Sequence, residues 1–586
     1  MTAAQAYYII NLLVYAGVDI MACLGLSLQF GVAGVTNFGF IIFQATGAYT
    51  AAVLSLPNQS SNGGFQSYLG GWNLPWPLPW IGAAIAGGLV ALPFTFLVGR
   101  RLRGDFAAVG LLVTAVMANL LVTNYRSLFN GAAGLSLVPS PLQGEFNPTS
   151  QGYQWAYAAV ALILAGGVFL LVNRVTESPY GRSLRAMRDN DIVADSLGKN
   201  LLSMRASVLV LGGMLAGLSG AVLVGFINTW SPAAWGYAET IVLFAAVIIG
   251  GAGNHRGAVL GAILVPVGFE EATRYISGPP GLVDDLQWVA IGLLIATFLW
   301  FRPRGVLPER RRLSGPPPDI SQRTAVSPLV PQASTEVVLR SAGVTKDFGG
   351  VRAVGNVSIE VRHGTLTGLI GPNGAGKSTL LAMLAGTLPV TSGQVEYLGR
   401  DVTRVPAYGR ARLGLVRTFQ LASEFKRLTV LENLLSAVPR HRGDSLRGAL
   451  LGRRFWGADE AAATQRAWAL LEQFGLAAHA GTYAGDLSGG QRRLVEIMRA
   501  LMAEPKVLLL DEPMAGVHPH LAHQIGEQLL GLCADGMTIL MVEHELAIMD
   551  EFCDPVIVMA EGTVLAEGTM AQLRDRAEVV EAYLVG

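Results

Sequence analysis

Long apolar runs separated by short connections occupy the chain up to about Phe301. A membrane-spanning helix needs roughly 20 mainly apolar residues, and several of these runs reach that length. The predicted spans are residues 7–28, 32–54, 80–98, 106–125, 155–172, 206–227, 238–251, 257–269 and 286–300. The hydropathy pattern therefore predicts an α-helical polytopic membrane domain of about nine spans within residues 1–302.

Basic residues decide whether the short runs 238–251 and 257–269 count as one broken element or as two spans. Cytoplasmic loops collect Lys and Arg, and these residues gather at 100–103, at 174–205 and after the last run, at Arg302 and Arg304. If the two runs are separate spans, all three basic connections lie on the same side of the membrane. If they form one broken element, the last connection lies on the opposite side. We therefore predict that the N-terminus is outside and the C-terminus is in the cytoplasm.

Ionisable residues are rare within the predicted spans. Asp19 and Glu239 stand out, and Glu270 and Glu271 lie near a span end. An intramembrane carboxylate is costly and tends to face a transport pathway or a partner group. For Asp19, a role on the transport pathway and a role in a helix–helix hydrogen bond fit the sequence equally well. The position of Glu239 near the outer mouth favours a structural role.

The pattern changes after about Glu336, where charged and apolar residues alternate as they do in soluble α/β domains. We predict a second domain at residues 336–586. Residues 303–335 are rich in proline, serine and arginine without apolar periodicity, which predicts a flexible cytoplasmic linker. The formal net charge of zero is an average over the apolar and the α/β regions, so it says nothing about partners. The three cysteines lack metal-binding spacing, which fits a reducing compartment.

The sequence GPNGAGKST follows a short buried-strand pattern at residues 365–370. It matches GxxxxGK[ST] between a strand and a helix, where backbone N–H groups cradle phosphates. Lys377 is expected to reach the β/γ oxygens and Ser378 to bind Mg²⁺. The other predicted phosphate-loop residues are Gly371, Asn373, Gly374, Gly376 and Thr379.

Two further motifs complete a nucleotide site. The apolar strand pattern at 507–510 ends in Asp511, expected to bind Mg²⁺, and Glu512, placed to polarise the attacking water. Between the motifs stands LSGGQ, with helix-like sequence from Arg492 onward. Its predicted second anion site, again at a helix start, comprises Ser488, Gly489, Gly490 and Gln491.

The phosphate loop, LSGGQ and VLLLDEP, in this order, resemble the ATP-binding domain of ABC transporters over residues 336–586. The resemblance implies ATP and Mg²⁺ as cofactors. It further implies that Phe348 in KDFGG stacks on adenine and that His544 in MVEHE contacts the γ-phosphate. Gln420 in RTFQ is implied to link Mg²⁺ and the attacking water to the membrane domain. One departure is His518 in AGVHP, where many relatives carry Asp or Asn.

A narrower resemblance covers both halves of the chain. KDFGGVRAV, LIGPNGAGKST and the ending VVEAYLVG resemble LivG-type ATPases of branched-chain amino acid importers. GLSLQFGVAGVTNFGF, GRSLRAMRDNDIVADSLGKN, VIIGGAGNHRGAVLGA and FRPRGVLPER are similar to LivM-type permeases. The resemblance implies ATP-driven import of branched-chain or related hydrophobic amino acids across the bacterial cytoplasmic membrane. It also implies a coupling helix at residues 189–201, resting on the ATPase near Gln420.

One permease and one ATPase make half a transporter. The resemblance implies a second, LivH/LivF-like permease–ATPase pair, separate or fused, or else a second copy of this chain. It also implies an extracytoplasmic substrate-binding protein, contact with the lipid bilayer and no nucleic-acid partner. The alternatives are an importer of urea, short amides or other small organic acids, an ABC exporter half, and a non-transporting sensor. Exporter halves typically have six long spans, and a sensor predicts a degenerate site, so both fit less well.

Overall fold

The computed structural model describes residues 3–59, 65–99, 104–269, 282–309, 336–418 and 424–585. The chain forms two compact units: Met1–Leu184 with Leu202–Arg311, and Arg185–Leu201 with Arg312–Gly586. We call them the helical unit and the α/β unit. Gln420, Glu270 and Glu271, the basic residues at 100–103, and most of the predicted linker lie outside the described residues.

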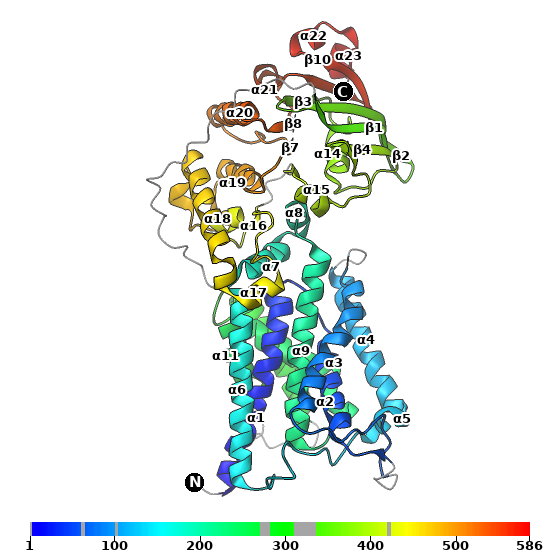
Figure 1. Ribbon diagram of the computed structural model, residues 1–586, viewed down its shortest axis with the longest axis vertical. Coiled ribbons are helices and arrows are strands. Elements are labelled where there is room, and N and C mark those ends of the chain that lie inside the picture. Colours follow the sequence, from blue (N-terminus) through cyan, green and yellow to red (C-terminus); the bar gives the residue numbers. More distant parts are fainter. Residues whose placement is uncertain are drawn as a thin grey trace. The chain divides into compact units, whose positions relative to one another are not determined.

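The helical unit consists mainly of apolar helices. The helix α1 (Ala3–Leu26) continues as the π-helix η1 (Ser27–Val32), and α11 (His255–Ala262) continues as η5 (Ile263–Phe269). The other long elements are α2 (Ile41–Ser55), α3 (Leu78–Leu97), α4 (Gly104–Asn124), α6 (Gln151–Thr176), α9 (Leu201–Ile227), α10 (Tyr237–Gly251) and α13 (Leu282–Phe301). Within this unit, α1 runs beside α6 (Figure 1), and Gln29 of η1 donates to the Leu209 carbonyl of α9 at 3.2 Å.

Six helices among the described residues are long and apolar enough to cross a membrane: Ala4–Val32, Leu78–Leu97, Asp105–Asn124, Gln151–Thr176, Leu201–Ile227 and Pro232–Gly251. Three apolar helices are shorter, at Ile41–Ser55, His255–Gly268 and Trp288–Phe301. The predicted helical apolar domain is therefore confirmed. Helix length supports six spans, and the count of about nine stays a prediction.

The expected helix at residues 32–54 is wrong at its start, because α2 begins only at Ile41. A buried polar network occupies the preceding turn. The Asn37 side chain donates to Gln29 Oε1 at 3.1 Å and accepts from the Gly39 N–H at 3.1 Å, and Gln29 Nε2 donates to the Leu209 carbonyl at 3.2 Å. These side chains bind one another and backbone groups, which favours an irregular turn over a continued helix.

Close helix packing accounts for two of the glycines in this unit. A Cβ on Gly47 of α2 would lie 2.1 Å from the Gly217 carbonyl oxygen of α9. A Cβ on Gly261 of α11 would lie 1.9 Å from the Ala246 carbonyl oxygen of α10. Small residues let backbones approach in this way, so the predicted role of the glycine-rich runs in close packing is confirmed at these positions.

The α/β unit contains two sheets. The six-stranded sheet has the order β10-β9-β3-β8-β7-β6, and the four-stranded antiparallel sheet has the order β2-β1-β4-β5. The strands are β1 (Val337–Phe348), β2 (Val351–Arg362), β3 (Leu366–Ile370), β4 (Ser392–Tyr397), β5 (Arg400–Asp401), β6 (Leu415–Arg417), β7 (Val507–Asp511), β8 (Thr538–Val542), β9 (Val556–Ala560) and β10 (Thr563–Gly568). All pairs in the larger sheet are parallel except β9 with β10.

Helices cover the larger sheet and form a lobe beside it (Figure 1). They are α14 (Lys377–Ala385), α15 (Ala407–Arg412), α16 (Val430–Ser436), α17 (Leu446–Leu451), α18 (Arg453–Gln473), α19 (Gly489–Met502), α20 (Pro519–Ala534), α21 (Leu546–Phe552), α22 (Met570–Arg574) and α23 (Ala577–Val585). Every residue of β3, β7 and β8 is buried, as expected for parallel strands covered on both faces. The predicted α/β fold is confirmed.

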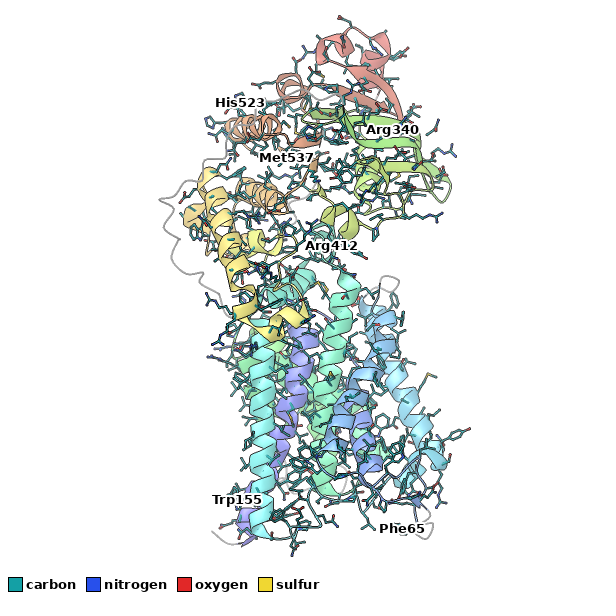
Figure 2. All side chains as sticks on the ribbon, in the orientation of Figure 1. Phe65, Trp155, Arg340, Arg412, His523 and Met537 are labelled. Atoms are coloured by element: carbon teal, nitrogen blue, oxygen red, sulfur yellow. The ribbon has the colours of Figure 1, made fainter. Side chains whose placement is uncertain are left out.

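The segment Arg185–Leu201 belongs to the α/β unit although it lies between α6 and α9 in sequence. It contains the end of α7 (Pro179–Asp189) and α8 (Asp191–Ser196), whose N-cap Asn190 accepts from the Val193 N–H. Within the unit, Arg185 pairs with Glu432 at 3.1 Å and Lys199 pairs with Asp444. Arg412 of α15 (Figure 2) donates from Nε to the Gly198 carbonyl at 2.8 Å.

Candidate functional site

Three neighbouring strands of the larger sheet end at one edge. The phosphate loop follows β3, Asp511 ends β7, and His544 stands two residues after β8. Ligands of open α/β sheets bind beyond the carboxyl ends of parallel strands. The strand order therefore brings together groups that are far apart in sequence.

The phosphate loop has a conformation that requires glycine at two positions. Gly371 has a φ of 154°, and a Cβ there would lie 2.1 Å from the Met559 carbonyl oxygen. Gly376 has a φ of 93°, and a Cβ there would lie 2.5 Å from the Ala353 carbonyl oxygen. Gly376 is also the N-cap of α14, so the loop leads directly to a helix N-terminus, where N–H groups and the helix dipole favour a phosphate.

Lys377 begins α14 and folds back over the loop. Its ammonium donates to the carbonyls of Gly371 at 2.7 Å and Pro372 at 3.0 Å. Burial lowers the pKa of Lys377, whereas the nearby charges of Glu512 and Asp511 act in the opposite direction. An ammonium bound by two backbone carbonyls can exchange these hydrogen bonds for phosphate oxygens.

Asp511 is almost completely buried and lies between a hydroxyl and an arginine. Ser378 Oγ donates to its Oδ1 at 3.2 Å, and Arg417 donates to its Oδ2 at 2.9 Å. A hydroxyl and a carboxylate oxygen at this separation are the hard oxygen donors that Mg²⁺ prefers. The Ser378–Asp511 pair therefore fits the predicted metal.

Glu512 lies in the left-handed region with a φ of 51°, which is rare for a residue other than glycine and concentrates at functional sites. The surrounding contacts hold this conformation, since its N–H donates to the Val542 carbonyl at 2.9 Å and Arg493 donates to its carbonyl. Its Oε1 lies 2.7 Å from His544 Nε2. The two predicted catalytic groups thus share a hydrogen bond at the sheet edge.

Sequence reasoning missed three charged residues at this edge: Arg417, Arg493 and Glu543. Arg493 is 4% exposed, pairs with Glu496 and donates to the backbone around Glu512. Glu543 accepts from the Met514 N–H at 2.7 Å, and burial raises its pKa to about 7. For Glu543 the available signal was a charge directly after an apolar strand pattern. Arg493 carried no comparable signal.

The remaining predicted residues lie elsewhere in the unit. Phe348 ends β1 with half of its surface exposed, and the Lys346 ammonium lies 5.2 Å from its ring centroid. Ser488 caps α19, which begins at Gly489 and not at Arg492 as the sequence suggested, because Ser488 and Gln491 form a reciprocal capping box. His518 caps α20 by accepting from the His520 N–H. The assigned roles of Phe348 and Ser488 stay predictions.

Comparison with known proteins agrees with this arrangement. Residues 354–515 match the family model "ABC transporter", and residues 8–298 match "Branched-chain amino acid transport system / permease component". A probable branched-chain amino acid transport ATP-binding protein LivG of Archaeoglobus fulgidus is 39% identical over 42% of this chain and 95% of its own length. The high-affinity branched-chain amino acid transport ATP-binding proteins BraF of Pseudomonas aeruginosa and LivG of Escherichia coli K12 are each 36% identical, over 42% and 43% of this chain and 97% and 98% of their own lengths.

The parallel sheet, its phosphate loop and the LSGGQ helix define the α/β unit as the nucleotide-binding ATPase of an ABC transporter, fused to an apolar helical membrane unit. Such ATPase domains work as dimers together with permease components. The chain belongs to the branched-chain amino acid transport family of ABC transporters, and it joins the permease and the LivG-type ATP-binding component in one polypeptide.

Proposed function

We propose that this chain supplies one permease domain and one ATPase domain of an importer that moves branched-chain or related hydrophobic amino acids across the bacterial cytoplasmic membrane. The observation that carries the proposal is the complete set of Lys377, Ser378, Asp511, Glu512 and His544 at one sheet edge, in the same polypeptide as the permease match. A degenerate regulatory ATPase would not be expected to retain all five groups. The relatives are named as branched-chain amino acid transport proteins, which supports this solute class.

ATP hydrolysis follows from the positions of Glu512 and His544. The Glu512 carboxylate accepts a proton from the attacking water, whose oxygen bonds to the γ-phosphorus while the bond to the ADP oxygen breaks. His544, 2.7 Å from Glu512, orients that carboxylate and donates to a γ-phosphate oxygen. Lys377 neutralises charge on the β/γ oxygens, and Phe348 stacks on adenine.

Mg²⁺ is the second cofactor in this proposal. Ser378 and Asp511 are the described residues that would hold it, with Gln420 as a further ligand. When bound, the ion neutralises phosphate charge and orients the oxygens for displacement.

The second half of the transporter provides the other face of the nucleotide site. In this proposal, Ser488 and Gln491 at the N-terminus of α19 bind the phosphates of ATP held by the other ATPase domain. The partner is a LivH/LivF-like permease–ATPase pair or a second copy of this chain. A substrate-binding protein delivers the solute from outside.

The permease domain in this proposal has about nine spans, with the N-terminus outside and the ATPase in the cytoplasm. The segment Arg185–Leu201 acts as the coupling element. Its side chains Arg185 and Lys199 are 7% and 6% exposed and pair with Glu432 and Asp444 of the ATPase unit, so the segment is packed into that unit at both ends.

Uptake of labelled leucine tests the proposal, with cells carrying the intact system compared with an otherwise identical strain carrying Glu512→Gln. We expect leucine accumulation in the first strain and its loss in the second. A parallel arm measures labelled urea. Urea uptake alone would retain the mechanism and replace the solute, and absence of any Glu512-dependent uptake of either solute would overturn leucine import.

A further inference from the structure

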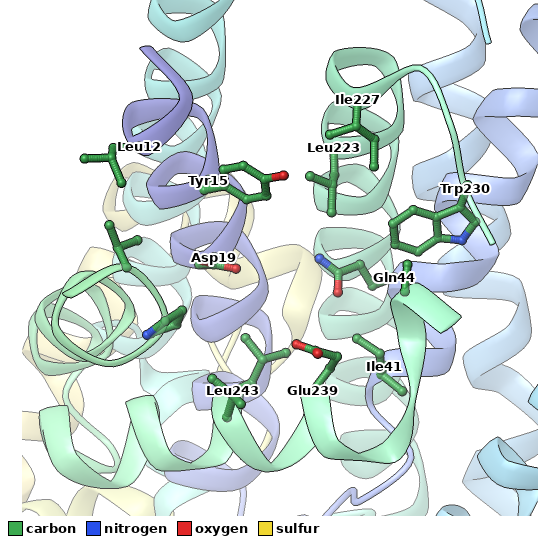
Figure 3. Close-up of a pocket in the computed structure, with 14 residues that line it drawn as sticks. Leu12, Tyr15, Asp19, Ile41, Gln44, Leu223, Ile227, Trp230, Glu239 and Leu243 are labelled. Atoms are coloured by element: carbon green, nitrogen blue, oxygen red, sulfur yellow. The ribbon is translucent and has the colours of Figure 1, made fainter. Parts of the chain in front are cut away.

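A cavity of about 490 Å³ lies inside the helical unit. Five parts of the chain line it: α1, α2, α9 with the connection that follows it, α10, and η5 (Figure 3). Its volume falls within the range of about 300–1,000 Å³ that is typical of small-molecule sites. Two of these parts lie beside irregular backbone, since α2 begins after the turn at 33–40 and η5 is a π-helix that continues α11.

Three polar side chains from different helices point into this cavity. Figure 3 shows the carboxylates of Asp19 from α1 and Glu239 from α10, together with the carboxamide of Gln44 from α2, directed into the same space. The Ile41 N–H donates to Thr240 Oγ1 at 3.3 Å, which ties the start of α2 to α10. Gln44 and Glu239 are therefore held on helices that are fixed to each other.

Gln44 supplies a polar group to the cavity wall. Its side chain is 6% exposed and lines the cavity. A polar side chain on a mainly aliphatic wall is expected to hydrogen-bond a polar ligand or water in the cavity.

Two carboxylates on the wall can bind a cationic group of a ligand. The described lining contains two carboxylates and no Lys, Arg or His. Carboxylates in a membrane interior attract a cationic group, and the low dielectric strengthens this attraction. The rest of the wall is mainly aliphatic, including Leu12, Leu223 and Leu243. A ligand with one ammonium group and one branched apolar group matches both parts of the wall.

We propose that this cavity is the compartment through which the transported amino acid passes. Asp19 and Glu239 bind its α-ammonium group, Gln44 donates to its carboxylate, and the aliphatic wall contacts its side chain. This inference rests on the proposed import of branched-chain amino acids and deepens it. It gives Glu239 a pathway role in place of the structural role that its sequence position favoured, and it disfavours neutral solutes such as urea.

Thiol protection tests the cavity directly in membranes that contain the full chain. Leu223→Cys places a thiol on the wall, and Val224→Cys, next to it on α9 but buried outside the lining, is the matched control. The three native cysteines are buried, so the unsubstituted chain gives the background. The reagent is methyl methanethiosulfonate, and the probes are leucine, its decarboxylated analogue 3-methylbutylamine and its deaminated analogue 4-methyl-2-oxopentanoate.

We expect leucine and 3-methylbutylamine to slow the reaction of Leu223→Cys and leave Val224→Cys unchanged. We expect 4-methyl-2-oxopentanoate, which lacks the ammonium group, to give no protection. Adding Asp19→Asn or Glu239→Gln should raise the leucine concentration needed for half-protection by about tenfold or more, the loss expected when a hydrogen bond to a charged group is removed. Equal protection by the deaminated analogue, or no protection by leucine, would overturn the proposal.

Uptake separates this proposal from the proposed function. Asp19→Asn, Glu239→Gln and Gln44→Leu should lower leucine uptake, whereas Glu145→Gln, an exposed carboxylate outside the lining, should not. Asp19→Glu, which keeps the charge, should recover part of the uptake. Leucine uptake that depends on Glu512 but is unchanged in the cavity variants would reject the cavity and retain the importer. Uptake independent of Glu512 would reject the importer itself.

Discussion

Replacing Arg417 with methionine should destabilise the α/β unit most when Mg²⁺ and ATP are absent. Arg417 and Asp511 are 9% and 1% exposed at their side chains, and their N–O distance is 2.9 Å. At an effective dielectric constant of 20, two charges at this separation attract by about 6 kcal/mol. Part of that attraction offsets desolvation, and breaking a buried pair by removing one partner typically costs about 3–5 kcal/mol, because the remaining charge is left buried.

The matched control is Arg352→Met. Arg352 forms an ion pair with Asp347 at 3.0 Å, but the side chains are 68% and 35% exposed. An exposed pair contributes about 0–1 kcal/mol, so the same chemical change at nearly the same distance should have little effect. The difference between the two variants isolates the consequence of burial.

The assay is thermal unfolding of the purified full chain on a Glu512→Gln background, which prevents turnover. For a domain of this size, a loss of 3–5 kcal/mol lowers the apparent Tm by roughly 6–20 °C. Mg²⁺ with ATP should narrow the gap, because the metal supplies the positive charge that Arg417 provided. Equal Tm values for Arg417→Met and Arg352→Met, without and with Mg–ATP, would refute the reasoning.

Three further predictions concern other parts of the chain. Burial raises the pKa of Glu543 from 4.5 to about 7, so its stabilising contribution is complete below pH 4.5 and is lost as the pH rises to about 7. Urea unfolding of the α/β unit should therefore show a decline of about 3 kcal/mol over this window, which Glu543→Gln flattens. His544→Ala should lower ATP turnover by about 10²–10⁴-fold through the lost contact with Glu512, with nucleotide binding by fluorescence titration retained. Gly47→Leu should lower the yield of folded chain in detergent, judged by gel filtration, because a side chain there meets the Gly217 carbonyl, whereas Gly110→Leu, with open space around it, should not.

The sequence predicted the nucleotide site best where chemistry imposes a fixed local spacing. The loop from Gly371 to Ser378 must place several N–H groups and one ammonium around a phosphate, so its residues are readable without any tertiary contact. Arg417 could not be assigned in this way. Arg417 contacts Asp511, 94 residues away in sequence, because β6 and β7 are neighbours in the sheet. The sequence of neither strand predicts this strand order.

In the helical unit, hydropathy predicted which runs are helical but not where polar contacts interrupt them. Asn37 and Gln29 bind each other in the turn before α2, and neither residue is unusual enough on its own to predict the break. The cavity was beyond prediction for the same reason. Asp19 and Glu239 were recognised as costly residues, but only the packing of α1 against α10 shows that both face one space with Gln44.

The coupling segment links the two halves of the proposed mechanism through chain connectivity. Arg185 and Lys199, near its two ends, form buried ion pairs with Glu432 and Asp444, while Gly198 accepts from Arg412 in between. Removing one member of a buried pair is costly, so the segment should move with the ATPase unit as one body. The chain enters it from α6 and leaves it into α9, whose residue Leu223 lines the cavity. In the proposed mechanism, a displacement of the ATPase unit when it binds ATP would therefore act on a helix that forms the cavity wall.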